Sequence, residues 1–124
     1  MKKEEFEALV KGAILDLPSP FRKKMENIAI VIEANPTEEQ LKKTGIKFGN
    51  VLLGLYEGVP EITWGKKISS HLPDKITIFQ DSIENLAPSE EEIKKLIKKV
   101  VRHEIAHYVG FGEKGVKELE NNKL

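Results

Sequence analysis

The stretch that decides the fold is residues 89–112, which read SEEEIKKLIKKVVRHEIAHYVGFG. Ser89 is a favourable N-cap, and Glu92, three residues later, completes a capping box at the positive end of the helix dipole. The pattern predicts a helix that continues to about Val109, after which Gly110 supplies a stop. It is the longest and most clearly bounded element that the sequence predicts.

On a helical wheel, at about 100° per residue, this helix has one apolar side and one basic side. The apolar side is formed by Ile93, Leu96, Ile97, Val100, Val101 and Tyr108. Glu104 falls near the centre of the apolar side, and His103 and His107 fall along its edge. A carboxylate that faces the core costs free energy unless something pairs with it. We therefore expect Glu104 to have one of two partners. One is a buried salt bridge or hydrogen bond, and the other is a metal-bound water beside the histidines.

The two histidines are four residues apart, so their rings can converge on one metal ion from adjacent turns. Glu104 between them can accept a proton from a water that such an ion activates. The spacing H-E-x-x-H is that of the zinc-protease helix. Because the chain has no cysteine, any metal must be held by nitrogen and oxygen ligands. We therefore predict a zinc site with His103 and His107 as ligands and Glu104 as the catalytic base, although such ligands also suit other divalent metals.

A zinc site that keeps one water usually takes three protein ligands. Gly110 can turn the chain sharply after His107, which lets Glu113 swing back toward the ion in the extended spacing H-E-x-x-H-x-x-G-x-x-E. Glu118 and Glu120 are alternative third ligands. Glu113 could instead be an acidic residue that favours the N-terminus of a following helix.

The rest of the chain predicts shorter elements around this helix. Helices are predicted over Phe6–Leu17 (ended by Pro18 and Pro20), Phe21–Glu26, Thr37–Lys43, Ser82–Leu86 and from about Glu113 to Asn121. Strands are predicted over Ile28–Glu33, Val51–Glu57 and Lys75–Gln80. The first strand is apolar on both faces, which is typical of a buried strand. Gly54 in the second strand marks a bulge or a close backbone approach, and His71 is interpreted as an ordinary polar residue or a substrate contact.

Length and charge limit the classes of function. With 124 residues the chain is long enough for one domain, which we expect to span residues 1–124. Its 20 basic and 20 acidic residues cancel, so it lacks the overall basic field that dominates nucleic-acid binding. The sequence contains no membrane-length apolar run and no pattern of a secretion signal. We therefore expect a cytoplasmic monomer or weak oligomer with no nucleic-acid or membrane partner.

These residues together resemble the small bacterial and archaeal zincin-like metallopeptidase family, described as a minimal metallopeptidase fold. The resemblance covers about residues 17–118 and rests on the segments at 27–36 (NIAIVIEANP), 53–60 (LGLYEGVP), 73–79 (PDKITIF) and 103–110 (HEIAHYVG). It implies a single compact α+β domain in which a small mixed sheet of about three strands packs against an N-terminal helix and a long C-terminal zinc-binding helix. The family's third ligand is usually an aspartate after the glycine, which corresponds to Glu113 here.

The leading hypothesis for function is a zinc-dependent peptidase in which Glu104 deprotonates a water and an extended peptide pairs with the strand at Leu53–Glu57. Tyr56 and Tyr108 could each hydrogen-bond an oxyanion, with packing in the core as the alternative. A non-catalytic zinc-binding regulatory or interaction module would use the same ligands. A metal-dependent ribonuclease is a further alternative, because one bacterial RNA-maturation family shares the three-ligand spacing. That family has glycine where Glu104 stands and histidine where Glu113 stands.

Overall fold

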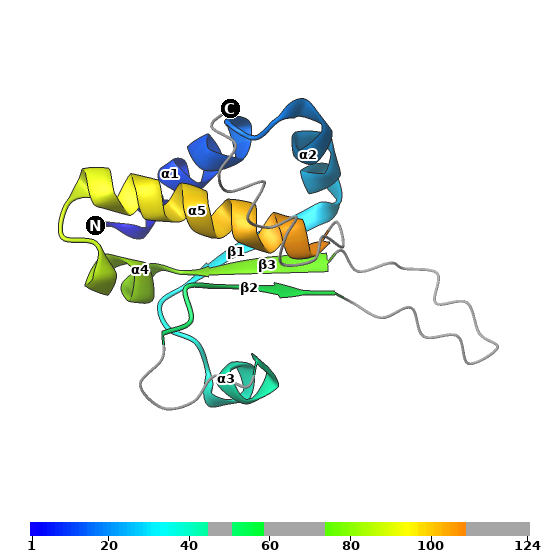
Figure 1. Ribbon diagram of the computed structural model, residues 1–124. Coiled ribbons are helices and arrows are strands. Elements are labelled where there is room, and N and C mark those ends of the chain that lie inside the picture. The colour runs from blue at the N-terminus through cyan, green and yellow to red at the C-terminus, as the bar shows by residue number, and fades with distance from the viewer. Residues whose placement is uncertain (45–50, 59–73, 109–124) are drawn as a thin grey trace.

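The computed structural model describes residues 1–44, 51–58 and 74–108. Within these ranges the chain forms five α-helices, one short 3₁₀ turn and three strands (Figure 1). The helix predicted from Glu113 to Asn121 lies outside them. Among the described helices, none combines the length and the apolar character needed to cross a membrane.

The three strands form one mixed sheet in the order β1-β3-β2. β1 (Ile28–Glu33) runs parallel to β3 (Asp74–Phe79). β2 (Gly54–Glu57) runs antiparallel to β3, with Tyr56 opposite Ile76. β3 is therefore the central strand, and β2 ends the sheet in the described part of the chain.

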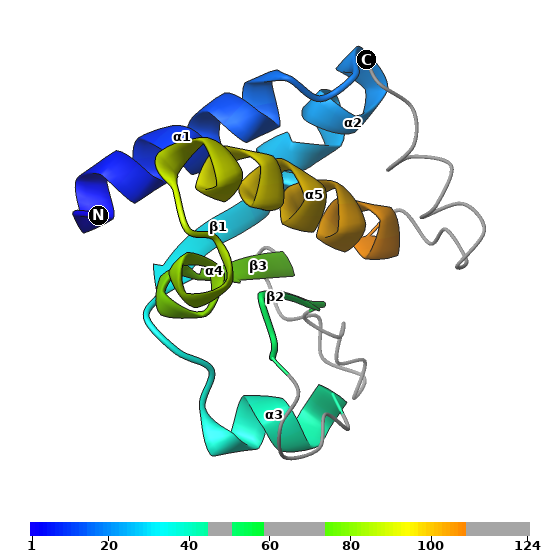
Figure 2. The same ribbon diagram turned by 60° about the vertical axis from the view of Figure 1, so that its left-hand side comes forward.

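Two helices from opposite ends of the sequence, α1 (Lys3–Leu15) and α5 (Glu90–Tyr108), pack against each other on one side of this sheet (Figures 1 and 2). Their inward side chains meet those of the strands in a single apolar core. This core includes Phe6, Val10, Ile28, Ile76, Ile78, Ile97, Val101 and Ile105. The predicted α+β class, with a small mixed sheet against an N-terminal and a long C-terminal helix, is confirmed.

The shorter helices lie close to their predicted places. They are α2 (Ser19–Lys24) with its following 3₁₀ turn (Met25–Asn27), α3 (Glu38–Thr44) and α4 (Gln80–Leu86). α2 begins earlier than the predicted Phe21 because Pro20 suits the first turn of a helix. α3 begins with a reciprocal cap, in which the Gln40 N–H donates to Thr37 Oγ1 at 3.1 Å and the Thr37 N–H donates to Gln40 Oε1 at 2.8 Å.

β1 has the predicted bounds, but the prediction that it is buried on both faces is wrong. Ile28 is its only buried residue, and the other five are partly exposed. The physical reason is its position, because β1 lies at an end of the three-stranded sheet. The central place belongs to β3, where the four residues from Ile76 to Phe79 are buried.

The start of α5 shows the Ser89 half of the predicted capping box. The Glu92 N–H donates to Ser89 Oγ at 3.2 Å, and the Ile93 N–H donates to the Ser89 carbonyl at 2.9 Å. The Ser89 side chain thus satisfies one of the backbone donors that a helix leaves unpaired at its first turn. The last described residue of the helix, Tyr108, is one residue before the predicted end.

Gly54 allows β2 to lie close to α5. The residue is buried at the start of β2. A Cβ atom at this position would lie 2.6 Å from Val100 Cγ1 and 3.3 Å from Glu104 Cγ, both on α5. Of the two interpretations of Gly54, the close backbone approach is therefore the one found.

We expect Gly54→Ala to lower the free energy of unfolding by about 1–3 kcal/mol, because the added methyl group overpacks the contact between β2 and α5. Chemical denaturation of the variant measures this loss. Gly12→Ala is the matched control, since a Cβ at Gly12 in α1 meets nothing within 4 Å. That change should raise stability by about 0.5–1 kcal/mol, because alanine is the better helix former. Equal effects of the two substitutions would contradict the close approach at Gly54.

Candidate metal centre

The last two turns of α5 bring His103, Glu104 and His107 together. Their candidate ligand atoms all lie within 4.8 Å of one another. Glu104 faces the core and is 8% exposed, His103 is partly exposed and His107 is exposed. This is the arrangement that the helical wheel predicts, with the carboxylate on the apolar side and the imidazoles along its edge.

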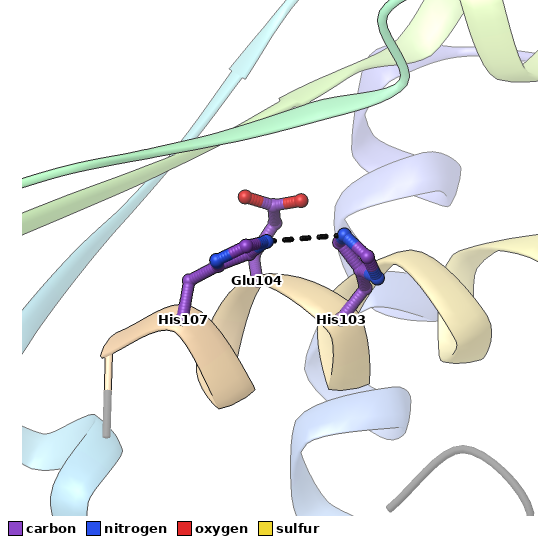
Figure 3. Close-up of side chains that lie close together, drawn as sticks. All are labelled: His103, Glu104 and His107. Carbon is purple, nitrogen blue, oxygen red and sulfur yellow. Dashed lines mark hydrogen bonds between the residues drawn. The ribbon is translucent and has the colours of Figure 1, made fainter. Parts of the chain in front are cut away.

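The two imidazoles converge through the same ring nitrogen. Nε2 of His103 and Nε2 of His107 are 3.1 Å apart, and the rings meet edge to face at 71° (Figure 3). Zinc–nitrogen bonds of about 2.0–2.1 Å at a tetrahedral angle separate two ligand nitrogens by about 3.3–3.4 Å. The 3.1 Å contact is a hydrogen bond, in which one Nε2–H donates to the other Nε2. Loss of this proton would let both nitrogens serve one divalent ion with little movement of either ring, so the pair fits the metal that the motif implies.

Glu104 is held by the backbone of β2. Its Oε1 accepts a hydrogen bond from the Tyr56 N–H at 2.9 Å, although 48 residues separate the two in sequence. Figure 3 shows the carboxylate extending from α5 toward β2, above the two rings. The bond offsets part of the cost of burying a charged group. The sequence left two expectations for this carboxylate, a buried hydrogen bond or a place beside the two histidines. The structure has both the hydrogen bond and the neighbouring histidines.

The Tyr56 N–H points away from the rest of the sheet. The Phe79 N–H donates to the Leu53 carbonyl at 3.0 Å, so Leu53 faces β3 through its backbone. Along an antiparallel strand, residues whose backbone groups face the neighbouring strand alternate with residues whose backbone groups face away from it. The backbone groups of Gly54 and Tyr56 therefore point away from β3. The Glu104 carboxylate therefore lies at the outer edge of β2, where it accepts the outward-pointing Tyr56 N–H.

Burial dominates the electrostatics of Glu104. Removal from water raises the pKa of the Glu104 carboxyl above its ordinary value. The neighbouring His103 and His107, and the hydrogen bond from the Tyr56 N–H, lower this pKa and oppose the effect of burial. A carboxyl whose pKa is moved upward is better suited to carry a proton near neutral pH than an ordinary glutamate.

The structure places the other predicted site residues as follows. The Tyr56 hydroxyl donates to Asp74 Oδ2 at 2.6 Å, and the ring packs against the core, which is the alternative to an oxyanion contact. Asp74 had no distinguishing pattern in the sequence. The side chain of Tyr108, together with Glu113, Glu118, Glu120 and His71, lies outside what the structure describes.

The zincin-like metallopeptidase family matches residues 25–123 of the chain by its sequence profile. No curated protein matches the chain in sequence. Among solved structures, a conserved hypothetical protein from T. thermophilus is similar to it, with a TM-score of 0.62 and 20% sequence identity. The match covers 87% of this chain and 94% of that one. At this identity the likeness concerns the fold alone.

The raised pKa of Glu104 makes a prediction for the metal-free protein. At a pH well below about 4.3, the ordinary pKa of a glutamate, the carboxyl is protonated in both the folded and the unfolded chain. As the pH rises from there to the higher folded-state pKa, the unfolded chain loses its proton first, so the free energy of unfolding falls. Glu104→Gln cannot ionise. The variant should therefore gain stability relative to the wild type across this interval, and its advantage should stay constant above it.

Denaturation in a chelator at a series of pH values measures this difference. Glu91→Gln, an exposed position on the same helix, is the control and should show no such rise. The opposite outcome is that Glu104→Gln loses stability relative to the wild type as the pH rises. It would show that folding stabilises the carboxylate, so that burial does not dominate its pKa.

Proposed function

Because the chain belongs to the zincin-like metallopeptidase family, we propose that it is a zinc-dependent peptidase in which Glu104 moves the protons of the reaction. The observation that carries the proposal is the position of the Glu104 carboxylate. It is buried, hydrogen-bonded to the edge strand β2, and adjacent to two imidazoles that converge through Nε2. A salt bridge in the core would not need those two rings beside it.

His103 and His107 would hold the metal through Nε2. The family pattern assigns the third ligand to Glu113, and Glu118 and Glu120 remain the alternatives. A zinc ion held there supplies Lewis acidity and lowers the pKa of water to about 7. Glu104 is less suited to be a ligand itself, because Oε1 is already engaged with the Tyr56 N–H at the sheet edge.

Glu104 would act as general base and then as general acid. Its carboxylate accepts a proton from the water that attacks the peptide carbonyl, and it later gives this proton to the leaving amine nitrogen. The Tyr56 N–H fixes Oε1, which leaves Oε2 to carry the proton. Burial raises the pKa of Glu104, which favours holding the proton between the two steps.

The substrate would bind as an added strand on β2. The outward backbone groups of Gly54 would pair with an extended peptide at this edge, whereas the Tyr56 N–H is already engaged by Glu104. Pairing there would bring the peptide backbone beside Glu104, because Glu104 bonds to the same edge. The substrate class is therefore an extended peptide or an unfolded protein segment.

We expect the zinc-loaded chain to cleave a proteome-derived peptide library, and Glu104→Gln to lower turnover by a factor of about 10²–10⁴, because it removes the proton carrier. Mass spectrometry of the digest measures cleavage, and elemental analysis measures bound zinc, which the variant should retain. Glu91→Gln is the control for a lost charge on the same helix. Hydrolysis that persists in Glu104→Gln would contradict the proposed mechanism. Zinc binding by the wild type without any cleavage would favour the non-catalytic zinc-binding module instead.

A further inference from the structure

In the part of the chain that the structure describes, β2 is a short edge strand, and the backbone donor of the site lies close to its end (Figure 1). The strand has four residues, and Tyr56, whose N–H holds Glu104, is the one before the last. The ends of an edge strand open more easily than the centre of a sheet. The donor that fixes the proton carrier therefore lies where fraying of β2 would move it first.

The backbone of Tyr56 does not itself join this residue to the central strand β3. Tyr56 is opposite Ile76, but its N–H donates to Glu104 on the other side. Hydrogen-bonded and non-hydrogen-bonded pairs alternate in an antiparallel ladder, so the ladder bonds to β3 belong to the neighbours Leu55 and Glu57. A direct polar connection from Tyr56 to β3 must therefore come from its side chain.

The hydroxyl of Tyr56 makes that connection. It donates to Asp74 Oδ2 at 2.6 Å, and Asp74 is the first residue of β3. This length lies in the range of about 2.5–2.7 Å for O–H···O⁻ bonds, which are about twice as strong as bonds between neutral groups. The phenol thus joins the edge strand to the central strand by a strong hydrogen bond, in addition to the packing of its ring against the core.

The opposite face of β2 carries weaker connections. Side chains alternate along a strand, so that of Glu57 lies on the other face from Tyr56. Its carboxylate lies 3.4 Å from Lys43 Nζ of α3 and 3.8 Å from Lys75 Nζ of β3, and these lysine side chains are 61% and 39% exposed. Ion pairs with such exposure contribute little, because water screens them. The Tyr56–Asp74 bond is therefore the stronger side-chain connection at this end of β2.

Little room surrounds the Tyr56 hydroxyl. Gly58 follows the strand, and a Cβ there would lie 3.0 Å from the hydroxyl oxygen and 3.6 Å from Cζ of the ring. The phenol is therefore confined between Asp74 and the backbone at Gly58. With the tip of the side chain fixed in this way, the Cα and the N–H of Tyr56 have less freedom to move away from Glu104.

From these observations we infer that Tyr56 is a positioning residue for the proton carrier. Its hydroxyl, anchored on Asp74, holds the end of β2 so that its own N–H keeps Glu104 Oε1 in place. The inference rests on the proposed function for the role of Glu104 in the reaction, and on the two hydrogen bonds for the positioning itself. Tyr56 acts on the reaction through Glu104.

The test compares the wild type with Tyr56→Phe, which removes the hydroxyl and keeps the ring and the N–H. Amide hydrogen exchange followed by ¹⁵N NMR gives the protection of the N–H at position 56 in the full chain, independent of turnover. This protection should fall by at least about tenfold more than that of the β3 amides, because the end of β2 frays while the rest of the sheet stays closed.

Steady-state kinetics of the zinc-loaded chain measure the effect on catalysis, with a peptide that the wild type cleaves. In Tyr56→Phe, kcat should fall about three- to thirtyfold, since a misplacement of about 1 Å can cost about 10²-fold. KM should change by less than about twofold, because the lost positioning serves the transition state rather than the binding of substrate.

Asp74 offers a rescue, and Asp81 offers a matched control. Asp74→Asn keeps an oxygen that can accept from the phenol, so it should retain most of the protection at position 56, whereas Asp74→Ala should match Tyr56→Phe. The double variant should add no further loss, because both changes remove the same bond. Asp81→Ala also removes an aspartate acceptor, that of Asn35 Nδ2 at 3.2 Å, but on α4. It should leave kcat and the protection at position 56 unchanged.

The outcomes separate the positioning from the proposed peptidase. Protection at position 56 that stays unchanged, or that falls only as far as that of β3, overturns the positioning. Selective loss of protection with an unchanged kcat overturns the role of Tyr56 in catalysis and leaves the peptidase in place. Selective loss in a protein whose wild type cleaves no peptide supports the holding of Glu104 by Tyr56 and overturns the peptidase.

The inference does not depend on the folding of one variant. Thermal unfolding shows whether Tyr56→Phe folds, and Asp74→Ala probes the same bond from its other end. The wild type gives a further check, because a Tyr56 N–H that exchanges as fast as in an unfolded chain overturns the inference without any variant.

Discussion

The hydrogen bond between the Tyr56 N–H and the Glu104 carboxylate joins the two parts of the molecule that make the site. Tyr56 belongs to the edge strand β2, and Glu104 belongs to the long helix α5. The bond requires β2 to lie close to α5, which Gly54 permits because any Cβ there would meet Val100 at 2.6 Å. One backbone donor therefore fixes both the position of the carboxylate and the distance of the sheet edge from the histidines.

This arrangement has a cost in stability that is consistent with a functional site. A buried carboxylate is unfavourable unless it is paired, and burial is the largest influence on the pKa of Glu104. A chain selected for stability alone would be better served by a leucine at this position on the apolar side of α5. The chain instead places the carboxylate beside two imidazoles, where a raised pKa and a metal could both be used.

The sequence predicted those features that depend on local patterns. The apolar stripe of α5 and the inward position of Glu104 follow from helical periodicity, and the Ser89 cap follows from the residue types at the start of the helix. The prediction that Ile28–Glu33 is a buried strand is wrong, because the composition of one strand does not show its position in the sheet. The contact from Tyr56 to Glu104 could not be predicted either, since a backbone N–H has no residue signature. Only Gly54, as a sign of close approach, indicated that something lies near β2.

An anomalous difference map of crystals of the protein grown with zinc would locate the metal relative to His103, Glu104 and His107. We expect one strong zinc peak bonded to Nε2 of both His103 and His107, with Glu104 Oε1 still hydrogen-bonded to the Tyr56 N–H and outside bonding distance of the ion. A zinc ion bonded directly to the Glu104 carboxylate, or no peak between the two imidazoles, would contradict the assignment of Glu104 as the proton carrier of a metal centre.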